Sequence, residues 1–207
     1  SNNKFIPISF KKYVNEKYSD NLLINYFKLE NLKTFDVSEK DSPSELANFN
    51  FLIENPKQFE SFFDGGSLQH TFNIPIVMKN ISNHVKVGGS ITHVVSSNNL
   101  CGFGFYQFSP EFFIKYYSEH NGFKNTDVFV ADYDNLKNWY KLKNNSLNNI
   151  SINTSARLIC LVRTEKYKDV EIKEIFQDIF FTDSNKNEIV NLKKTRINKR
   201  YLFQFFS

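Results

Sequence analysis

Apolar and polar positions along this chain switch between two spacings, one typical of helices and the other typical of buried strands. Apolar residues three and four apart predict helices over residues 18–29, 74–85 and 109–118. Ser109 and Pro110 suit the cap and the first turn of the third helix. Short apolar runs bounded by turn residues predict strands at residues 32–37, 49–53, 59–63, 90–95, 126–132 and 157–163.

Two stretches interrupt this pattern. Residues 86–89 (KVGG) predict a turn, and the polar stretch 144–153 predicts a loop. The resulting order alternates strands with helices and then places two strands in succession. Alternation of this kind favours an α/β fold with a mostly parallel sheet and helices on both faces.

Length and composition indicate one globular domain. The chain has 207 residues, of which 41% are hydrophobic and 23% charged, and this is enough to bury a core without disulfides. Residues 170–181 are a candidate helix, and the Phe-rich stretch 201–206 is expected to pack back onto the body of the protein.

Charge and cysteine usage exclude several classes of function. The net charge of +4 is too small to indicate a nucleic-acid partner. The basic residues between 193 and 200 are interpreted as a solvated tail, with a phosphate-contacting patch as the alternative. Cys101 and Cys160 lie outside any CxxC pair, so no zinc or redox motif is expected. No apolar run approaches the roughly 18 residues of a membrane helix, and a cytoplasmic protein is predicted.

One stretch carries an ordered set of motifs. Residues 63–73 read FDGGSLQHTFN, and residues 98–111 read NNLCGFGFYQFSPE, with a helix, KVGG and a strand between them. This set resembles a subgroup of class I, Rossmann-like, S-adenosylmethionine-dependent methyltransferase-like proteins often associated with surface-glycan biosynthesis. In that subgroup a Glu stands at the position of Gln69 and a His at that of Phe103. The resemblance is dense from Phe63 to Phe123.

The resemblance implies a Rossmann-like methyltransferase fold, with a mostly parallel seven-stranded sheet, helices on both faces and an antiparallel last strand. It implies a single domain over residues 1–207, with its core at about 4–168 and a C-terminal extension over 169–207 that packs on the core. Residues 4–9 are then the first strand, 32–37 the second, 59–63 the fourth, 90–95 the fifth, and 126–132 and 157–163 the last two.

The resemblance also assigns roles at the carboxyl ends of these strands, where open α/β sheets bind ligands. Asp36 is expected to hold the ribose hydroxyls of S-adenosylmethionine, and Glu54 to lie near its adenine. Asp64, with Gly65 and Gly66 behind it, is expected to lie near the sulfonium. The alternative for each aspartate is a carboxylate that caps a helix or a turn.

A second set of residues is expected to serve the methyl acceptor. His70 is the candidate catalytic base, because an imidazole titrates near neutral pH; a histidine that packs at a helix start is the alternative. Phe105, Tyr106 and Gln107 are candidates for binding the substrate, or for a simple packed loop. His84 and His93 are interpreted as structural, and no set of residues with metal-ligand spacing is found.

The glycine pattern conflicts with the resemblance. All seven glycines lie between Gly65 and Gly122, yet the usual cofactor turn after the first strand needs glycine for the close approach of backbone to ligand. A shifted cofactor, a lost cofactor site or a different N-terminus would each explain this. The sequence therefore predicts a methyltransferase with a divergent cofactor motif, acting on a small or glycan-linked acceptor. The alternative is a catalytically inactive binding or scaffolding protein.

Overall fold

The computed structural model describes residues 31–142 and 154–172, together with Ile24, Leu29 and Ile175. Residues up to Asn48 belong to one compact unit and those from Phe49 to another, so each is described by itself. In the first unit, strands β1 (Phe35–Asp36) and β2 (Glu45–Leu46) pair in parallel, and the 3₁₀ helix η2 (Glu39–Asp41) lies between them in the sequence.

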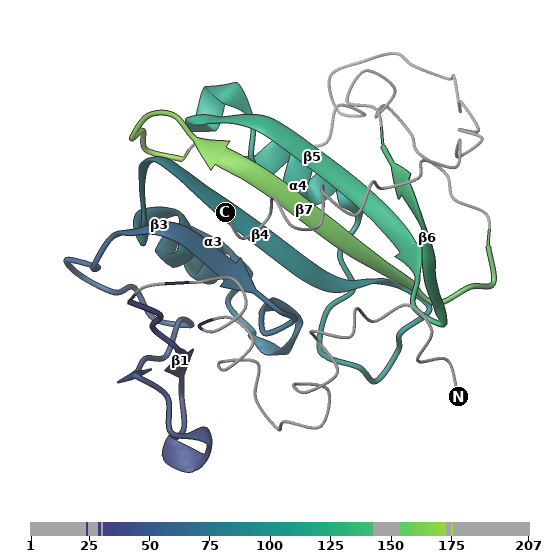
Figure 1. Cartoon of the computed structure of the whole chain (residues 1–207), viewed down its shortest axis with the longest axis horizontal. Helices are drawn as coiled ribbons and strands as arrows, with labels where there is room; N and C mark the ends of the chain where they lie inside the picture. The colour runs from purple at the N-terminus through teal and green to yellow at the C-terminus, as the bar shows by residue number, and fades with distance from the viewer. Residues whose placement is uncertain (1–23, 25–28, 30, 143–153, 173–174, 176–207) are drawn as a thin grey trace. The chain divides into compact units, whose positions relative to one another are not determined.

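The second unit is built on a five-stranded mixed sheet with the strand order β3-β4-β7-β5-β6 (Figure 1). Strand β7 lies between β4 and β5 although it comes last in the sequence. The strands are β3 (Phe59–Asp64), β4 (Val85–Asn98), β5 (Phe123–Asp132), β6 (Asn135–Lys141) and β7 (Leu158–Lys166).

Strand directions bring three loops to one edge of this sheet. Strands β3 and β4 are parallel, and β7 is antiparallel to both β4 and β5, so β3, β4 and β5 all point the same way. Asn98 and Asp132, the last residues of β4 and β5, both pair with Leu158. We call this side of the sheet the carboxyl edge. The loops that follow β3, β4 and β5 start there.

Both described α-helices pack on the same face of the sheet, behind the strands in the view of Figure 1. Helix α3 (Ile74–Asn83) connects β3 to β4, and helix α4 (Pro110–Tyr116) follows β4. Ser109 caps α4, because its side chain accepts a hydrogen bond from the amide of Glu111. The buried core between helices and sheet consists of apolar side chains from both, including Val77, Met78, Ile81, Ile91, Val95, Phe113, Tyr117, Val128, Cys160 and Val162.

The expected Rossmann-like fold, with a mostly parallel seven-stranded sheet and helices on both faces, is wrong. Among the described residues only β3 and β4 are parallel neighbours in the large sheet, and α3 and α4 share one face. The two-residue turn after β5 reverses the chain directly into β6, and such a short connection allows only antiparallel pairing. Strand β6 was not expected, because its sequence, NLKNWYK, is too polar to register as a buried strand.

Several single elements agree with the sequence pattern and others do not. Strand β3 and helices α3 and α4 lie where they were predicted. Residues 49–53 were predicted as a strand but form a turn and irregular chain. The candidate elements at residues 4–9 and 201–206 and the predicted loop at 144–153 lie outside the described residues, as do nearly all of 18–29 and most of 170–181.

The predicted turn at residues 86–89 is instead the first part of the long strand β4. Its pairing with β3 is irregular here, since Phe59 pairs with Val85 but Ser61 pairs with Ser90. A Cβ on Gly89 would lie 2.7 Å from the carbonyl oxygen of Glu60 in β3. The glycine therefore allows two strands to approach across an irregular register, which the sequence alone presents as a turn signal.

Candidate binding site

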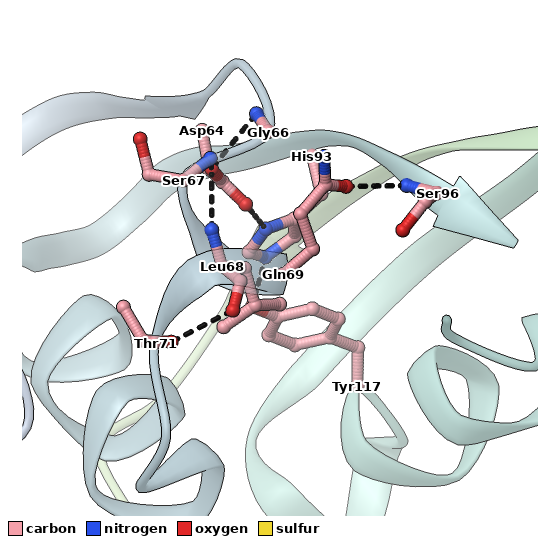
Figure 2. A network of polar contacts seen from close by, with 9 residues as sticks. All are labelled: Asp64, Gly66, Ser67, Leu68, Gln69, Thr71, His93, Ser96 and Tyr117. Carbon is pink, nitrogen blue, oxygen red and sulfur yellow. Dashed lines mark hydrogen bonds and ion pairs between the residues drawn. The ribbon is translucent and has the colours of Figure 1, made fainter. Parts of the chain in front are cut away.

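The turn after β3 is organised by the carboxylate of Asp64. Its Oδ1 accepts hydrogen bonds from the backbone amides of Gly66 (3.1 Å), Ser67 (2.7 Å) and Leu68 (3.2 Å), as Figure 2 shows. Gly66 adopts a positive φ of 109°, which a residue with a Cβ rarely adopts. The sequence Asp-Gly-Gly thus forms a tight turn around one carboxylate oxygen and leads into the 3₁₀ helix η3 (Leu68–His70).

The second oxygen of Asp64 begins a buried polar chain. Oδ2 lies 2.9 Å from Nδ1 of His93 in β4, and Nε2 of His93 lies 2.7 Å from the hydroxyl of Tyr117 at the end of α4. All three side chains are buried, and His93 is fully inaccessible to solvent. We call Asp64, His93 and Tyr117 the buried triad. Its polar groups bond to one another inside the protein, and through Asp64 it supports the turn after β3.

Proton placement in the triad follows from its donors and acceptors. The carboxylate of Asp64 only accepts, so Nδ1 of His93 carries a proton and donates. Burial raises the pKa of Tyr117 well above its ordinary value, with smaller contributions from Tyr116 and Asp64, so the phenol stays protonated. With that proton on Nδ1, Nε2 of His93 can accept a hydrogen bond from the hydroxyl of Tyr117, so that all three side chains have a partner.

The pKa of Asp64 is lowered by its surroundings. Burial by itself raises this pKa, but the hydrogen bond from His93 and the amides of Leu68 and Ser67 together outweigh it. The carboxylate is therefore ionised at neutral pH. Each of its oxygens already has a partner inside the protein. This matches the turn-capping alternative for Asp64, and the predicted contact with a sulfonium would have to displace these bonds.

Gln69, the middle residue of η3, joins this turn to the loop after β4. Its side-chain oxygen accepts from the amide of Ser96 (2.6 Å), and its side-chain nitrogen lies 3.4 Å from the carbonyl oxygen of Phe103. Its backbone oxygen accepts from the amides of Phe105 (2.8 Å) and Tyr106 (3.3 Å). Gln69 is buried and points into the body, whereas His70 is exposed.

Exposed aromatic rings gather on the loops of the carboxyl edge. Phe72 is 73% exposed, Phe105 71%, Phe103 47% and Tyr133 38%. The ring of Phe103 lies between His70 (centroids 6.4 Å apart) and Tyr133 (5.9 Å), and Phe72 meets Phe105 edge to face at 6.2 Å. We call these five residues the aromatic edge. They come from the loops that follow β3, β4 and β5.

A charged group borders the aromatic edge. The guanidinium of Arg157 lies over the ring of Tyr133, 4.9 Å from its centroid. Arg157 also forms a two-pronged ion pair with Asp134, in which its Nε donates to Oδ2 at 2.9 Å. The hydrogen bond from Arg157 lowers the pKa of Asp134. Tyr133 thus contacts both the guanidinium of Arg157 and the ring of Phe103.

The other predicted cofactor residues differ in their surroundings. Asp36 belongs to the other compact unit, where its Oδ1 accepts from the amide of Ser38 at 2.9 Å, as in a turn. Glu54 is exposed on an irregular loop. Gly65 is exposed beside Gly66, and a Cβ on it would lie 3.1 Å from the ring of Phe63.

The three predicted substrate-binding residues make different contacts. Phe105 presents an open ring on the aromatic edge. The hydroxyl of Tyr106 donates to the carbonyl oxygen of Phe72 at 2.9 Å. The side-chain oxygen of Gln107 accepts from the amide of Leu100 at 2.7 Å. Tyr106 and Gln107 thus shape the loop, and Phe105 is the member of the three that a ligand could stack against.

No family model matches the chain, and no curated protein matches it either. The resemblance to methyltransferase-like proteins therefore stays a prediction. Within the described ranges, no three His, Cys, Asp or Glu side chains lie close enough together to hold a metal ion. No helix in this part of the chain is both long and apolar enough to cross a membrane.

Sequence reasoning missed Phe72, Phe103 and Tyr133 as candidate binding residues. Phe103 was noted only for the histidine it replaces, and Tyr133 lies between two strands of which one was not expected. The available signal was their position, since each follows the end of a strand in a Gly- or Asp-containing loop. Which rings come into contact depends on strand order, and the local pattern of apolar and polar residues does not specify this order.

Proposed function

We propose that this protein binds a small or glycan-linked ligand on its aromatic edge, and that it works as a binding protein and not through catalysis at Asp64. The observation that carries the proposal is the gathering of four exposed aromatic rings from three loops at the carboxyl ends of parallel strands. This is where open α/β sheets hold their ligands.

The exposure of these rings is the physical argument for a ligand. A Phe or Tyr side chain offers 150–250 Å² to bury, at roughly 25 cal/mol per Å² of apolar area. Phe72 and Phe105 leave most of that area in water, although the core beneath them buries its apolar side chains closely. A flat apolar surface, such as the C–H face of a sugar ring or a nucleobase, can cover such rings by stacking.

The rigid support beneath the rings favours binding as well. Asp64 and Gln69 fix the loops after β3 and β4 that carry Phe72, Phe103 and Phe105, so less conformational entropy remains to be lost when a ligand binds. The same arrangement is the reason for preferring binding over catalysis. Asp64 is buried and bonded to four partners, so it is available neither to a sulfonium nor to a reacting group.

S-adenosylmethionine-dependent methyl transfer is the second candidate function. The observation that favours it is the exposed imidazole of His70, next to Phe103 on the same edge. An imidazole in this position could take a proton from a hydroxyl or amine acceptor. Against this candidate stands Asp64, since both oxygens of its carboxylate already have partners inside the protein.

The test is ligand-observed NMR on the full chain, with adenosine, S-adenosylmethionine, a hexose and an N-acetylhexosamine as separate probes. We expect saturation transfer to a ring-bearing probe, and a roughly 5- to 30-fold weaker affinity in Phe105→Ala and Phe103→Ala, about 1–2 kcal/mol each. Val87→Ala is the matched control, because Val87 is also an exposed apolar residue (53%) but lies near the opposite end of β4.

The possible outcomes separate the two candidates. The proposal would be refuted if no saturation were transferred to any of the four probes at millimolar concentration. It would also be refuted if Val87→Ala lost as much affinity as Phe105→Ala and Phe103→Ala. Micromolar binding of S-adenosylmethionine, with release of its demethylated product in the presence of an acceptor and loss of turnover in His70→Ala, would favour the second candidate.

A further inference from the structure

The side-chain amide of Gln69 has an orientation fixed by chemistry. One end faces the backbone amide of Ser96, which can only donate, and the other faces the carbonyl of Phe103, which can only accept. The oxygen must therefore point to Ser96 in β4 and the nitrogen to Phe103 in the loop. A single buried side chain connects the end of the sheet to the loop that carries two of the exposed rings.

The backbone of Gln69 reinforces this contact. Its carbonyl oxygen accepts from the amides of Phe105 and Tyr106. Gly104 packs directly on it, since a Cβ there would lie 2.7 Å from the same oxygen and 3.0 Å from Cγ of Gln69. Residues 99–109, which we call the aromatic loop, are therefore held at three consecutive positions by one residue of η3.

We propose that Gln69 is a positioning residue for the aromatic loop, whose amide holds Phe103 and Phe105 in place on the aromatic edge. This inference rests on the proposed function in taking the aromatic loop as the part that binds ligand. Its structural content concerns the closed position of the loop and can be measured without any ligand.

An amide and a carboxylate differ sharply at this position. In Gln69→Glu, the ionised side chain still accepts from Ser96 but has no proton to donate, so it faces the carbonyl oxygen of Phe103 with a repulsive contact. The protonated side chain regains a donor. Burial raises the pKa of a carboxyl group above its ordinary value of about 4.3, so this variant is expected to switch within the mildly acidic range.

Hydrogen exchange of the full chain tests the proposal. The readout is the protection factor of the amides of Phe105 and Tyr106, that is, the exchange rate relative to the unstructured rate at the same pH. In Gln69→Glu at pH 8 we expect protection to fall roughly 5- to 100-fold, as for the loss of a buried hydrogen bond, and to recover towards the wild-type value at pH 5. In Gln69→Met, which never donates, we expect low protection at both pH values.

Other titratable groups surround the site, and the wild type controls for them. Asp64 of β3, His93 of β4 and Tyr117 at the end of α4 form the adjacent triad, and His70 follows Gln69 directly. All four are present in the wild type, so the change in wild-type protection between pH 5 and pH 8 is the reference against which each variant is compared. The amide of Val77 in α3, bonded to Asn73, reports whether the rest of the unit stays folded.

The outcomes distinguish this inference from the proposed function. If both variants keep wild-type protection while the wild type binds a probe, the positioning role is wrong and the binding function stands. If protection in Gln69→Glu falls and recovers with pH while no probe binds, the positioning role stands and the binding function fails. Low protection in Gln69→Glu that does not recover at pH 5 would also overturn the role of the amide donor.

Discussion

Asp64 and His93 are joined side chain to side chain at 2.9 Å, although 29 residues separate them in the sequence. They are register partners on the parallel strands β3 and β4, so the pairing of these strands places the two groups opposite each other. Both are buried, and the bond fixes the turn that leads to the aromatic edge. The stability of the second unit should therefore depend on this pair.

Removing the carboxylate should cost much of that stability. We expect Asp64→Ala to lower the free energy of unfolding by about 3–5 kcal/mol, because His93 and three backbone amides lose their acceptor in a buried place. Urea denaturation followed by circular dichroism measures this. Asp134→Ala is the matched control, since its ion pair is exposed and should move the midpoint little. Equal effects in the two variants would contradict the structural role of Asp64.

Acid should weaken the same interaction. Because the folded-state pKa of Asp64 lies below its ordinary value of 3.8, the folded protein binds fewer protons here than the unfolded chain. The stabilisation is complete above the unfolded pKa and is lost as pH falls below it and through the folded pKa. The difference in unfolding free energy between wild type and Asp64→Asn should therefore be constant near neutrality and shrink below about pH 4. A difference that grows on acidification would contradict this sign.

A substitution at Tyr117, the other end of the buried triad, should lower the free energy of unfolding by less than Asp64→Ala does. Tyr117→Phe removes the hydroxyl that faces Nε2 of His93 at 2.7 Å, and we expect a loss of about 1–2 kcal/mol in thermal or urea unfolding. Tyr116→Phe is the control, because its hydroxyl lies 3.4 Å from Oγ of Ser82 and should contribute less. If Tyr116→Phe proves the more damaging of the two, the chain from Asp64 to Tyr117 does not support the turn as described.

Alanine substitutions at two glycines of the aromatic loop distinguish the stability cost of a steric clash from that of backbone strain. Gly104→Ala places a Cβ 2.7 Å from the carbonyl oxygen of Gln69, whereas Gly102→Ala meets nothing within 4 Å, although both residues have a positive φ. We expect Gly102→Ala to cost about 1 kcal/mol from strain alone. Gly104→Ala should cost more and should also raise amide exchange at Phe105 and Tyr106. Equal stability and equal exchange in both variants would show that the loop does not rest on Gln69.

Local sequence determined the elements whose signals are local. Ser109 followed by Pro110 starts α4, the spacing of Val77, Met78 and Ile81 gives α3, and Asp-Gly-Gly gives the turn after β3. Each depends on residues within about four positions, where capping, helical spacing and turn geometry act. Asp64 and Phe105 became candidates through the motif resemblance, which gave no indication of their partners in the fold.

Only the tertiary structure decided the sheet and the site. The insertion of β7 between β4 and β5, and the addition of the polar strand β6, are long-range pairings that periodicity cannot specify, and they overturned the Rossmann-like expectation. The pairing of β3 with β4 brings His93 to Asp64, and the placement of β5 in the same sheet brings Tyr133 to Phe103, across separations in sequence of about 30 residues. A side chain's type is fixed by the sequence, but its partner is fixed by strand order and register, because these determine which distant residues share an edge.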